Sequence, residues 1–178
     1  MAVAAGVSDR MGTMTEKFAA RLRAVEENET LREALRILSA AGVCVSVYAF
    51  FYFVVTGVSA DLWRTVKLVG CMAAGFVLVS ILRRVLNFAR PYEAVDFYPV
   101  PPKKRGGRAF PSRHAYSAAV IGTVLLFFSP MLGGITLGMG LLMSLSRVYL
   151  GLHFPRDAVA GTLIGISAGI LGMLVLRF

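Results

Sequence analysis

Five apolar segments of helical length constrain the fold of this 178-residue chain more than any other feature. A helix needs about 20 apolar residues to cross the hydrocarbon core of a bilayer. The third and fourth segments reach that length only with their polar flanks. A hydrophobic fraction of 57% supports membrane spans, because soluble domains have roughly 45–50%. The pattern predicts an all-α integral membrane protein with a bundle of about five transmembrane helices, over residues 37–57, 66–82, 115–128, 131–145 and 158–176.

The first 36 residues form an arm of different composition, ahead of a membrane domain over residues 37–178. Between residues 15 and 36, apolar side chains recur among charged ones at roughly helical spacing, and they are Phe18, Leu22, Val25, Leu31 and Leu35. This spacing predicts an amphipathic interfacial helix on the bilayer surface, and a solvated arm is the alternative. Because no basic residue precedes the short apolar run at residues 1–6, we expect no cleaved signal peptide.

The connections between the segments carry the glycine, proline and basic residues. Residues 129–134, which read SPMLGG, predict a tight turn with Pro130 and the glycine pair as helix breakers. Residues 58–65 predict a loop. The one long connection, residues 92–110, is either a charged surface loop or a lid over a substrate, and its basic cluster is Lys103, Lys104, Arg105 and Arg108.

The charge and cysteine content narrow the partners and cofactors. A net charge of +9 raises nucleic acid as a partner, but the basic residues lie beside apolar segments, so membrane lipids or a phosphate-bearing substrate fit better. Cys44 and Cys71 lie inside apolar segments without the spacing of metal ligands, which predicts two core residues rather than a disulfide or a metal site.

Three charged clusters lie at ends of the apolar segments, where charge is costly unless it has a function or a partner. The first reads RRVLNFARP. Its Arg83 and Arg90 are seven residues apart, so they share one helix face if the second helix continues to residue 89. Pro91 would then end that helix.

The second and third clusters supply the two histidines of the chain. The second reads PSRH, where Pro111 suits a first helical position and leaves the following N–H groups free. The third reads SRVYLGLHFPRD, in which Pro155 again marks a helix start. Helix N-termini and arginine side chains both attract phosphate oxygens. The clusters therefore predict a phosphate site built without metal.

His153 and Asp157 are four residues apart in the third cluster. At this spacing a carboxylate can hold one ring nitrogen and leave the other as a nucleophile. His114 is the only other histidine, which makes an accidental arrangement less convincing.

In order and spacing, the three clusters resemble the signature of the type 2 phosphatidic acid phosphatases. These are membrane lipid phosphatases related in their site to the vanadium haloperoxidases, and their motifs are K-x6-R-P, P-S-G-H and S-R-x5-H-x3-D. In this chain Arg83 replaces the lysine and Arg113 replaces the glycine. The third motif, from Ser146 to Asp157, matches fully.

The resemblance implies a role for each motif residue and no metal or other cofactor. His153 would attack phosphorus to form a phosphohistidine, Asp157 would orient it, and His114 would protonate the leaving oxygen and later activate water. The equatorial phosphate oxygens would be held by the backbone N–H near residue 113 together with Arg83, Arg90, Ser112 and Arg147. Arg113 is either tolerated by the local turn or directed toward a second anionic group of the substrate, and we favour the second interpretation.

A site at the bilayer surface implies a lipid substrate with a terminal phosphate. Polyprenyl phosphate or diphosphate, phosphatidate, phosphatidylglycerol phosphate and a phosphorylated lipid-linked sugar all satisfy this description. A lipid phosphotransferase on the same fold is an alternative. A non-catalytic membrane assembly or transport protein is another alternative, but it does not explain why all three clusters occur together in this order and spacing.

The distribution of lysine and arginine predicts the side of the membrane. With five spans, the N-terminal arm and all three clusters share one side. That side carries 16 of the 19 lysines and arginines, and the other carries Arg64, Lys67 and Arg177. The positive-inside rule then favours the cytoplasmic face, of a bacterial cytoplasmic membrane, over the extracytoplasmic face. Against this, bacterial lipid phosphatases of the family often carry one more N-terminal span and work on the outer face.

Overall fold

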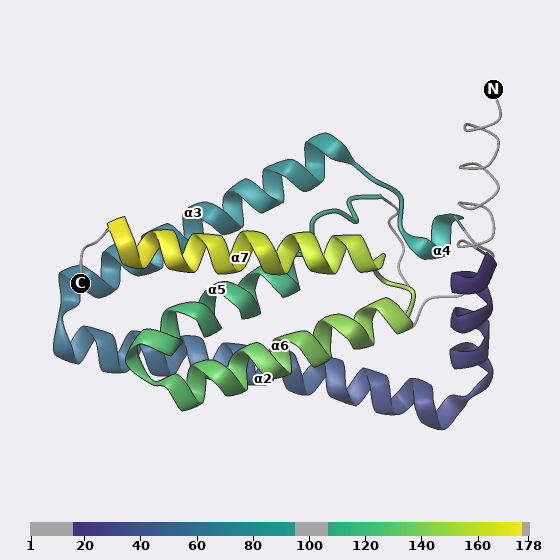
Figure 1. Ribbon diagram of the computed structural model, residues 1–178, viewed down its shortest axis with the longest axis horizontal. Coiled ribbons are helices and arrows are strands. Elements are labelled where there is room, and N and C mark those ends of the chain that lie inside the picture. The colour runs from purple at the N-terminus through teal and green to yellow at the C-terminus, as the bar shows by residue number, and fades with distance from the viewer. Residues whose placement is uncertain (1–15, 95–106, 176–178) are drawn as a thin grey trace.

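The computed structural model describes residues 16–94 and 107–175, and every regular element in these ranges is an α-helix. The long helices run side by side and the chain reverses between them (Figure 1). The all-α prediction is confirmed. After a first helix over residues 16–27, the elements are α2 (Glu29–Ala60), α3 (Leu62–Leu86), α4 (Pro91–Ala94), α5 (Arg113–Phe128), α6 (Pro130–Tyr149) and α7 (Pro155–Val175).

Helices α2, α3, α6 and α7 are long and apolar enough to cross a membrane, and α5 is a shorter apolar helix. Large apolar side chains face outward on the long helices, including Phe51, Trp63, Val85 and Leu174. Soluble monomers rarely expose so continuous an apolar surface. The chain is therefore an integral membrane protein whose outer surface is suited to lipid.

The prediction that Cys44 and Cys71 are core residues is wrong, because both are exposed. In a soluble protein an apolar segment usually marks the core. In a membrane bundle the lipid-facing side of a helix is equally apolar, so hydrophobicity alone does not separate the two faces.

The core is built around α5, whose residues from Ala115 to Leu125 are almost all buried. It packs mainly against α6 and α7, and more narrowly against α2 and α3. Glycine allows the close approach of α7: a Cβ at Gly165 would lie 2.6 Å from the carbonyl oxygen of Tyr116. The hydroxyl of Tyr116 also donates a 2.9 Å hydrogen bond to the carbonyl of Met72, which ties α5 to α3.

Two of the expected connections are much shorter than the sequence predicted. Only Asp61 separates α2 from α3, and its side chain caps α3 by accepting a 3.0 Å hydrogen bond from the backbone N–H of Arg64. Only Ser129 separates α5 from α6, because Pro130 begins α6 directly. The glycines expected in that turn, Gly133 and Gly134, lie inside α6.

The N-terminal helix ends earlier than expected, and residue 36 lies inside α2. Asn28 separates the two helices, and its side chain accepts a 2.9 Å hydrogen bond from the backbone N–H of Leu31. In the helix over residues 16–27, Leu22 is fully buried. That the helix rests on the bilayer surface stays a prediction. Residues 1–15, most of the basic connection at 95–106, and residues 176–178 lie outside the described ranges.

Candidate active site

Arg83 and Arg90 do not share a helix face, so this prediction is wrong. Arg83 lies in the last turn of α3, which ends at Leu86. Asn87 then adopts a left-handed conformation with φ 41° and ψ 38°, a role that asparagine can take in place of glycine at a helix C-terminus. Arg90 follows in a non-helical stretch, and Pro91 begins α4 instead of ending α3.

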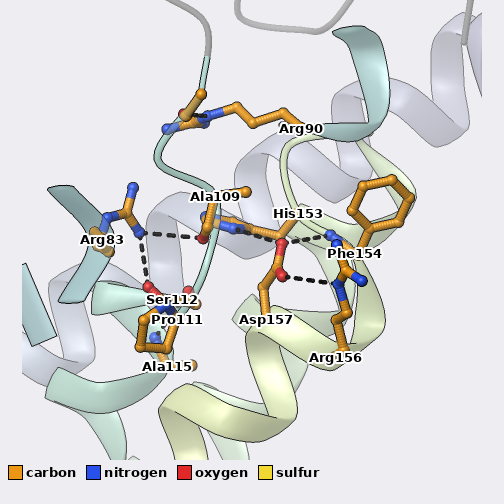
Figure 2. Close-up of polar contacts among 11 residues, drawn as sticks. Arg83, Arg90, Ala109, Pro111, Ser112, Ala115, His153, Phe154, Arg156 and Asp157 are labelled. Carbon is orange, nitrogen blue, oxygen red and sulfur yellow. Dashed lines mark hydrogen bonds and ion pairs between the residues drawn. The ribbon is translucent and has the colours of Figure 1, made fainter. Parts of the chain in front are cut away.

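Both arginines nevertheless point to the segment that leads into α5 (Figure 2). Nη1 of the buried Arg83 donates hydrogen bonds of 2.9 Å to the carbonyl of Pro111 and 3.4 Å to that of Ala109. Nε of Arg90 donates to the carbonyl of Gly107 at 3.0 Å. A guanidinium has five N–H donors, so each arginine holds this segment in place and keeps further donors for an anion.

The N-termini of α5 and α7 lie side by side. Ser112 is the N-cap of α5, and its side chain accepts from the backbone N–H of Ala115 at 3.4 Å. Pro111 therefore precedes the cap and is not the first helical residue. The backbone N–H of Ser112 donates a 2.9 Å hydrogen bond to the carbonyl of Asp157. Two helix N-termini with their positive dipole ends thus meet at one place.

Asp157 is fully buried in the first turn of α7 and fixes the loop that carries His153. Its Oδ2 accepts a 2.9 Å hydrogen bond from the backbone N–H of Phe154 and lies 3.6 Å from Nδ1 of His153. The second distance is slightly beyond a hydrogen bond. On the other side, Nε of Arg156 lies 3.7 Å from Oδ1 (Figure 2). Because the carboxylate faces Nδ1, the ring nitrogen available to a ligand is Nε2.

Burial lowers the pKa of His153, and the positive charges of Arg90 and Arg147 lower it further, whereas Asp157 opposes the shift. An ordinary histidine has a pKa of about 6.5. The imidazole of His153 is therefore neutral at neutral pH, with an unprotonated nitrogen that can act as a nucleophile.

Arg147 and His114 complete the set of predicted residues. Arg147 lies in the last turn of α6, where Nη1 donates to Oγ of Ser39 on α2 at 3.3 Å. Its buried Nε has no hydrogen-bond partner among the described residues. His114 is half-buried in the first turn of α5. Together with Arg113 it lines an apolar groove of about 460 Å³, whose walls include Phe50, Phe76 and Met143.

A cavity of about 550 Å³ is lined in part by Arg83 and Arg90, two of the arginines predicted to bind phosphate. Two of its lining residues, Arg84 and Arg108, were not among the site residues expected from sequence. Arg84 entered the sequence analysis only in the count of basic residues, and Arg108 only in the basic cluster of the connection over residues 92–110. The only sequence signal for Arg84 is that it follows Arg83 directly, and none places residue 108 beside the end of α3. The cavity is lined by Ser80, Arg83, Arg84, Asn87, Arg90, Gly107, Arg108 and Arg113.

Comparison with curated proteins finds three lipid-directed phosphatases. The chain is 30% identical over 105 residues to undecaprenyl-diphosphatase BcrC of Bacillus subtilis. It is 34% identical over 111 residues to an undecaprenyl-diphosphatase of Sulfolobus acidocaldarius, and 38% identical over 97 residues to a lipid A 4'-phosphatase of Bacteroides thetaiotaomicron. The matches cover 59%, 57% and 51% of this chain and 52%, 52% and 43% of the relatives. The chain thus spans about half the length of the curated relatives it matches.

Two solved structures share the fold over most of their length. Aquifex aeolicus LpxE superposes with a TM-score of 0.68 at 26% identity, covering 88% of this chain and 92% of that one. A PAP2 type phosphatidylglycerolphosphate phosphatase from Bacillus subtilis has a TM-score of 0.64 at 22% identity, and the match covers 90% of this chain and 84% of that one. Residues 64–178, which contain all three charged clusters, match the family model of the PAP2 superfamily. The sequence resemblance is thereby confirmed, and the chain belongs to the PAP2 superfamily.

Proposed function

We propose that this protein is a membrane lipid phosphatase that removes the terminal phosphate of its substrate through a phosphohistidine. One observation carries the proposal: a buried His153 lies beside a buried Asp157 where two helix N-termini meet. Arg83, Arg90 and Arg147 come from the adjoining ends of α3 and α6 and from the stretch before α4. The names of all three curated relatives, which are phosphatases or diphosphatases, support the same activity.

The first half of the reaction transfers the phosphoryl group to the protein. Nε2 of His153 attacks phosphorus, the N–P bond forms, and the bond from phosphorus to the lipid oxygen breaks. His114 donates a proton to that oxygen, which leaves as the lipid product. The arginine guanidinium groups and the N–H groups at the start of α5 stabilise the charge on the three equatorial oxygens.

The second half returns the protein to its starting state. His114, now unprotonated, accepts a proton from water, and the resulting hydroxide attacks the phosphohistidine. The N–P bond breaks, inorganic phosphate leaves, and His153 is again neutral. Asp157 keeps the loop and the ring of His153 in place during both halves, because it bonds the backbone of the adjacent Phe154.

The apolar groove beside the site suits a lipid substrate. Arg113 and His114 lie at its lining with apolar side chains of α2, α3, α5 and α6. A hydrocarbon chain in this groove removes apolar surface from water and brings its headgroup to His114. Hydrolysis of a lipid carrying a terminal phosphate is therefore better supported than that of a soluble phosphate ester.

A trapping experiment tests the mechanism. Purified protein in detergent micelles is given a radiolabelled polyprenyl phosphate, phosphatidate or phosphorylated lipid-linked sugar, and phosphate release and protein-bound label are measured. We expect His153→Ala to abolish both, and His114→Ala to slow release by roughly 10²–10⁴-fold while retaining acid-labile label. Lys67→Gln, at the opposite end of α3, is the control and should match wild type. Wild-type release by His153→Ala would overturn the mechanism.

We also infer that the site faces the cytoplasm, on the basis of the lysine and arginine distribution. The two ends of α2 supply a matched pair of exposed positions, Thr30 at the site end and Ala60 at the other. In a background with Cys44 and Cys71 replaced by serine, a membrane-impermeant thiol reagent should label Ala60→Cys in intact cells. It should label Thr30→Cys only after permeabilisation. The reverse pattern would place the site outside.

A further inference from the structure

Five guanidinium groups line one cavity of about 550 Å³, and none of the described residues in its lining is acidic. Small-molecule sites have volumes of roughly 300–1,000 Å³, so this volume is that of a headgroup site and not of a single phosphate pocket. Like charges gathered in one cavity repel one another, and an anion relieves that repulsion. The arrangement therefore favours an anionic occupant.

Three of the five arginines are not needed for phosphoryl transfer. Arg83 and Arg90 belong to the proposed transfer machinery, whereas Arg84, Arg108 and Arg113 are exposed residues of the same lining. Within residues 16–94 and 107–175, these three form no ion pair with a carboxylate. Their charges are available to a ligand.

Arg113 lies where two spaces meet, because it lines both the basic cavity and the apolar groove. Its guanidinium carbon is 5.7 Å from the centroid of the Phe76 ring, a cation–π distance. On the other side, the cavity shares Arg83 and Arg90 with the site of phosphoryl transfer. A group bound here would lie next to the reacting phosphate and beside the start of the lipid tail.

We propose that Arg84, Arg108 and Arg113 form a subsite for a second phosphate group directly linked to the first, so that lipid diphosphates are preferred over lipid monophosphates. The proposal rests on the proposed lipid phosphatase activity and deepens it. In the bound diphosphate, the terminal phosphorus faces His153 and the phosphate attached to the tail lies among the three arginines. That inner phosphate leaves with the lipid after the bond between the two phosphates breaks.

The test compares two substrates that differ only in the second phosphate. Geranylgeranyl diphosphate and geranylgeranyl monophosphate are hydrolysed in detergent micelles by wild type, Arg84→Gln, Arg108→Gln and Lys67→Gln. A hydrogen bond to a charged group corresponds to a factor of about ten or more. We expect Arg84→Gln and Arg108→Gln each to lower kcat/KM for the diphosphate about tenfold, and for the monophosphate less than about twofold. Lys67→Gln should change neither.

Inorganic pyrophosphate and orthophosphate then separate a lipid headgroup from a free anion as the ligand. With the monophosphate as substrate, pyrophosphate should inhibit wild type more strongly than orthophosphate does, and the two arginine variants should lose that difference. Equal losses on both lipids, or no loss on either, would overturn the subsite. Loss of pyrophosphate inhibition with unchanged diphosphate hydrolysis would also overturn it, because the cavity would then hold a free anion. A wild type inactive on these two lipids and also on the phosphatidate and phosphorylated lipid-linked sugar of the trapping experiment would instead refute the proposed function.

Discussion

Replacing Gly161 by alanine should separate the two helix N-termini on which the site depends. A Cβ at Gly161 would collide with the carbonyl oxygen of Ser112 and lie 3.1 Å from Cβ of Ala115. The first of these atoms is backbone, so no side-chain rotation relieves the contact. Helix α7 must move away from α5 at the point where the N–H of Ser112 bonds the carbonyl of Asp157.

Comparison with a glycine in an uncrowded helical position isolates the loss of stability caused by the clash. Overpacking of a close contact costs about 1–3 kcal/mol, and alanine gains about 1 kcal/mol over glycine in a helix. Gly138 lies in α6 with nothing within 4 Å of its Cβ position, so Gly138→Ala shows the helical gain alone. The free energies of unfolding of the two variants should therefore differ by about 1–3 kcal/mol, with Gly161→Ala the less stable.

Gly165→Ala separates activity from stability. Its Cβ would lie 2.6 Å from the carbonyl oxygen of Tyr116, so its packing cost is similar, but it lies one helical turn, about 6 Å, farther along α7. A misplacement near 1 Å can cost about 10²-fold in rate. At a temperature where every variant is folded, we expect kcat to fall about tenfold or more in Gly161→Ala and much less in Gly165→Ala.

The measurements are detergent-micelle unfolding curves and initial rates of phosphate release. If Gly161→Ala were as stable and as active as Gly138→Ala, the helices could not be as close as described. If Gly165→Ala lost as much activity as Gly161→Ala at equal folding, the effect on rate would not depend on proximity to Ser112 and Asp157.

Three further outcomes follow from the site. Burial and nearby arginines lower the pKa of His153, so its protonation should reduce kcat/KM only below about pH 6.5, the ordinary histidine value. If the pH profile of kcat/KM showed His153 becoming protonated at or above about pH 6.5, a lowered pKa would be contradicted. Asp157→Asn keeps an acceptor for the N–H of Phe154 but loses the charge beside His153, so kcat should fall at least about tenfold with little change in unfolding. Activity should survive EDTA and be inhibited by vanadate, which mimics five-coordinate phosphorus; activity restored only by added magnesium would refute this.

The sequence predicted the convergence of the motifs because short-range features fix much of their geometry. Pro155 begins α7 as expected, so Asp157 falls in the first turn of that helix and His153 in the loop before it. The N-cap at Ser112 likewise follows from a hydroxyl side chain just before an apolar helix. These features depend on a few neighbouring residues, which sequence reasoning can evaluate.

The sequence misplaced features that depend on competition between similar local options. Asn87 ends α3 three residues before Arg90, although nothing in the apolar pattern requires the helix to stop there. Gly133 lies inside α6, where a Cβ would meet the backbone of Leu126 on α5, so this glycine serves a tertiary contact that is invisible in sequence. The same limit hid Arg84 and Arg108, which line one cavity only because residues 107–111 return to the end of α3.

The length of α5 decides the depth of the site. Helix α5 has 16 residues and α2 has 32, which correspond to about 24 Å and 48 Å. Figure 1 shows α5 starting short of the ends of α2 and α7. Ser112, the N-cap of α5, accordingly lies beside Gly161, which is six residues into α7, while Arg83 and Arg147 lie in the last turns of α3 and α6. If the proposed function is correct, a recessed start of α5 would let one lipid place its headgroup among these arginines and its tail in the adjoining apolar groove.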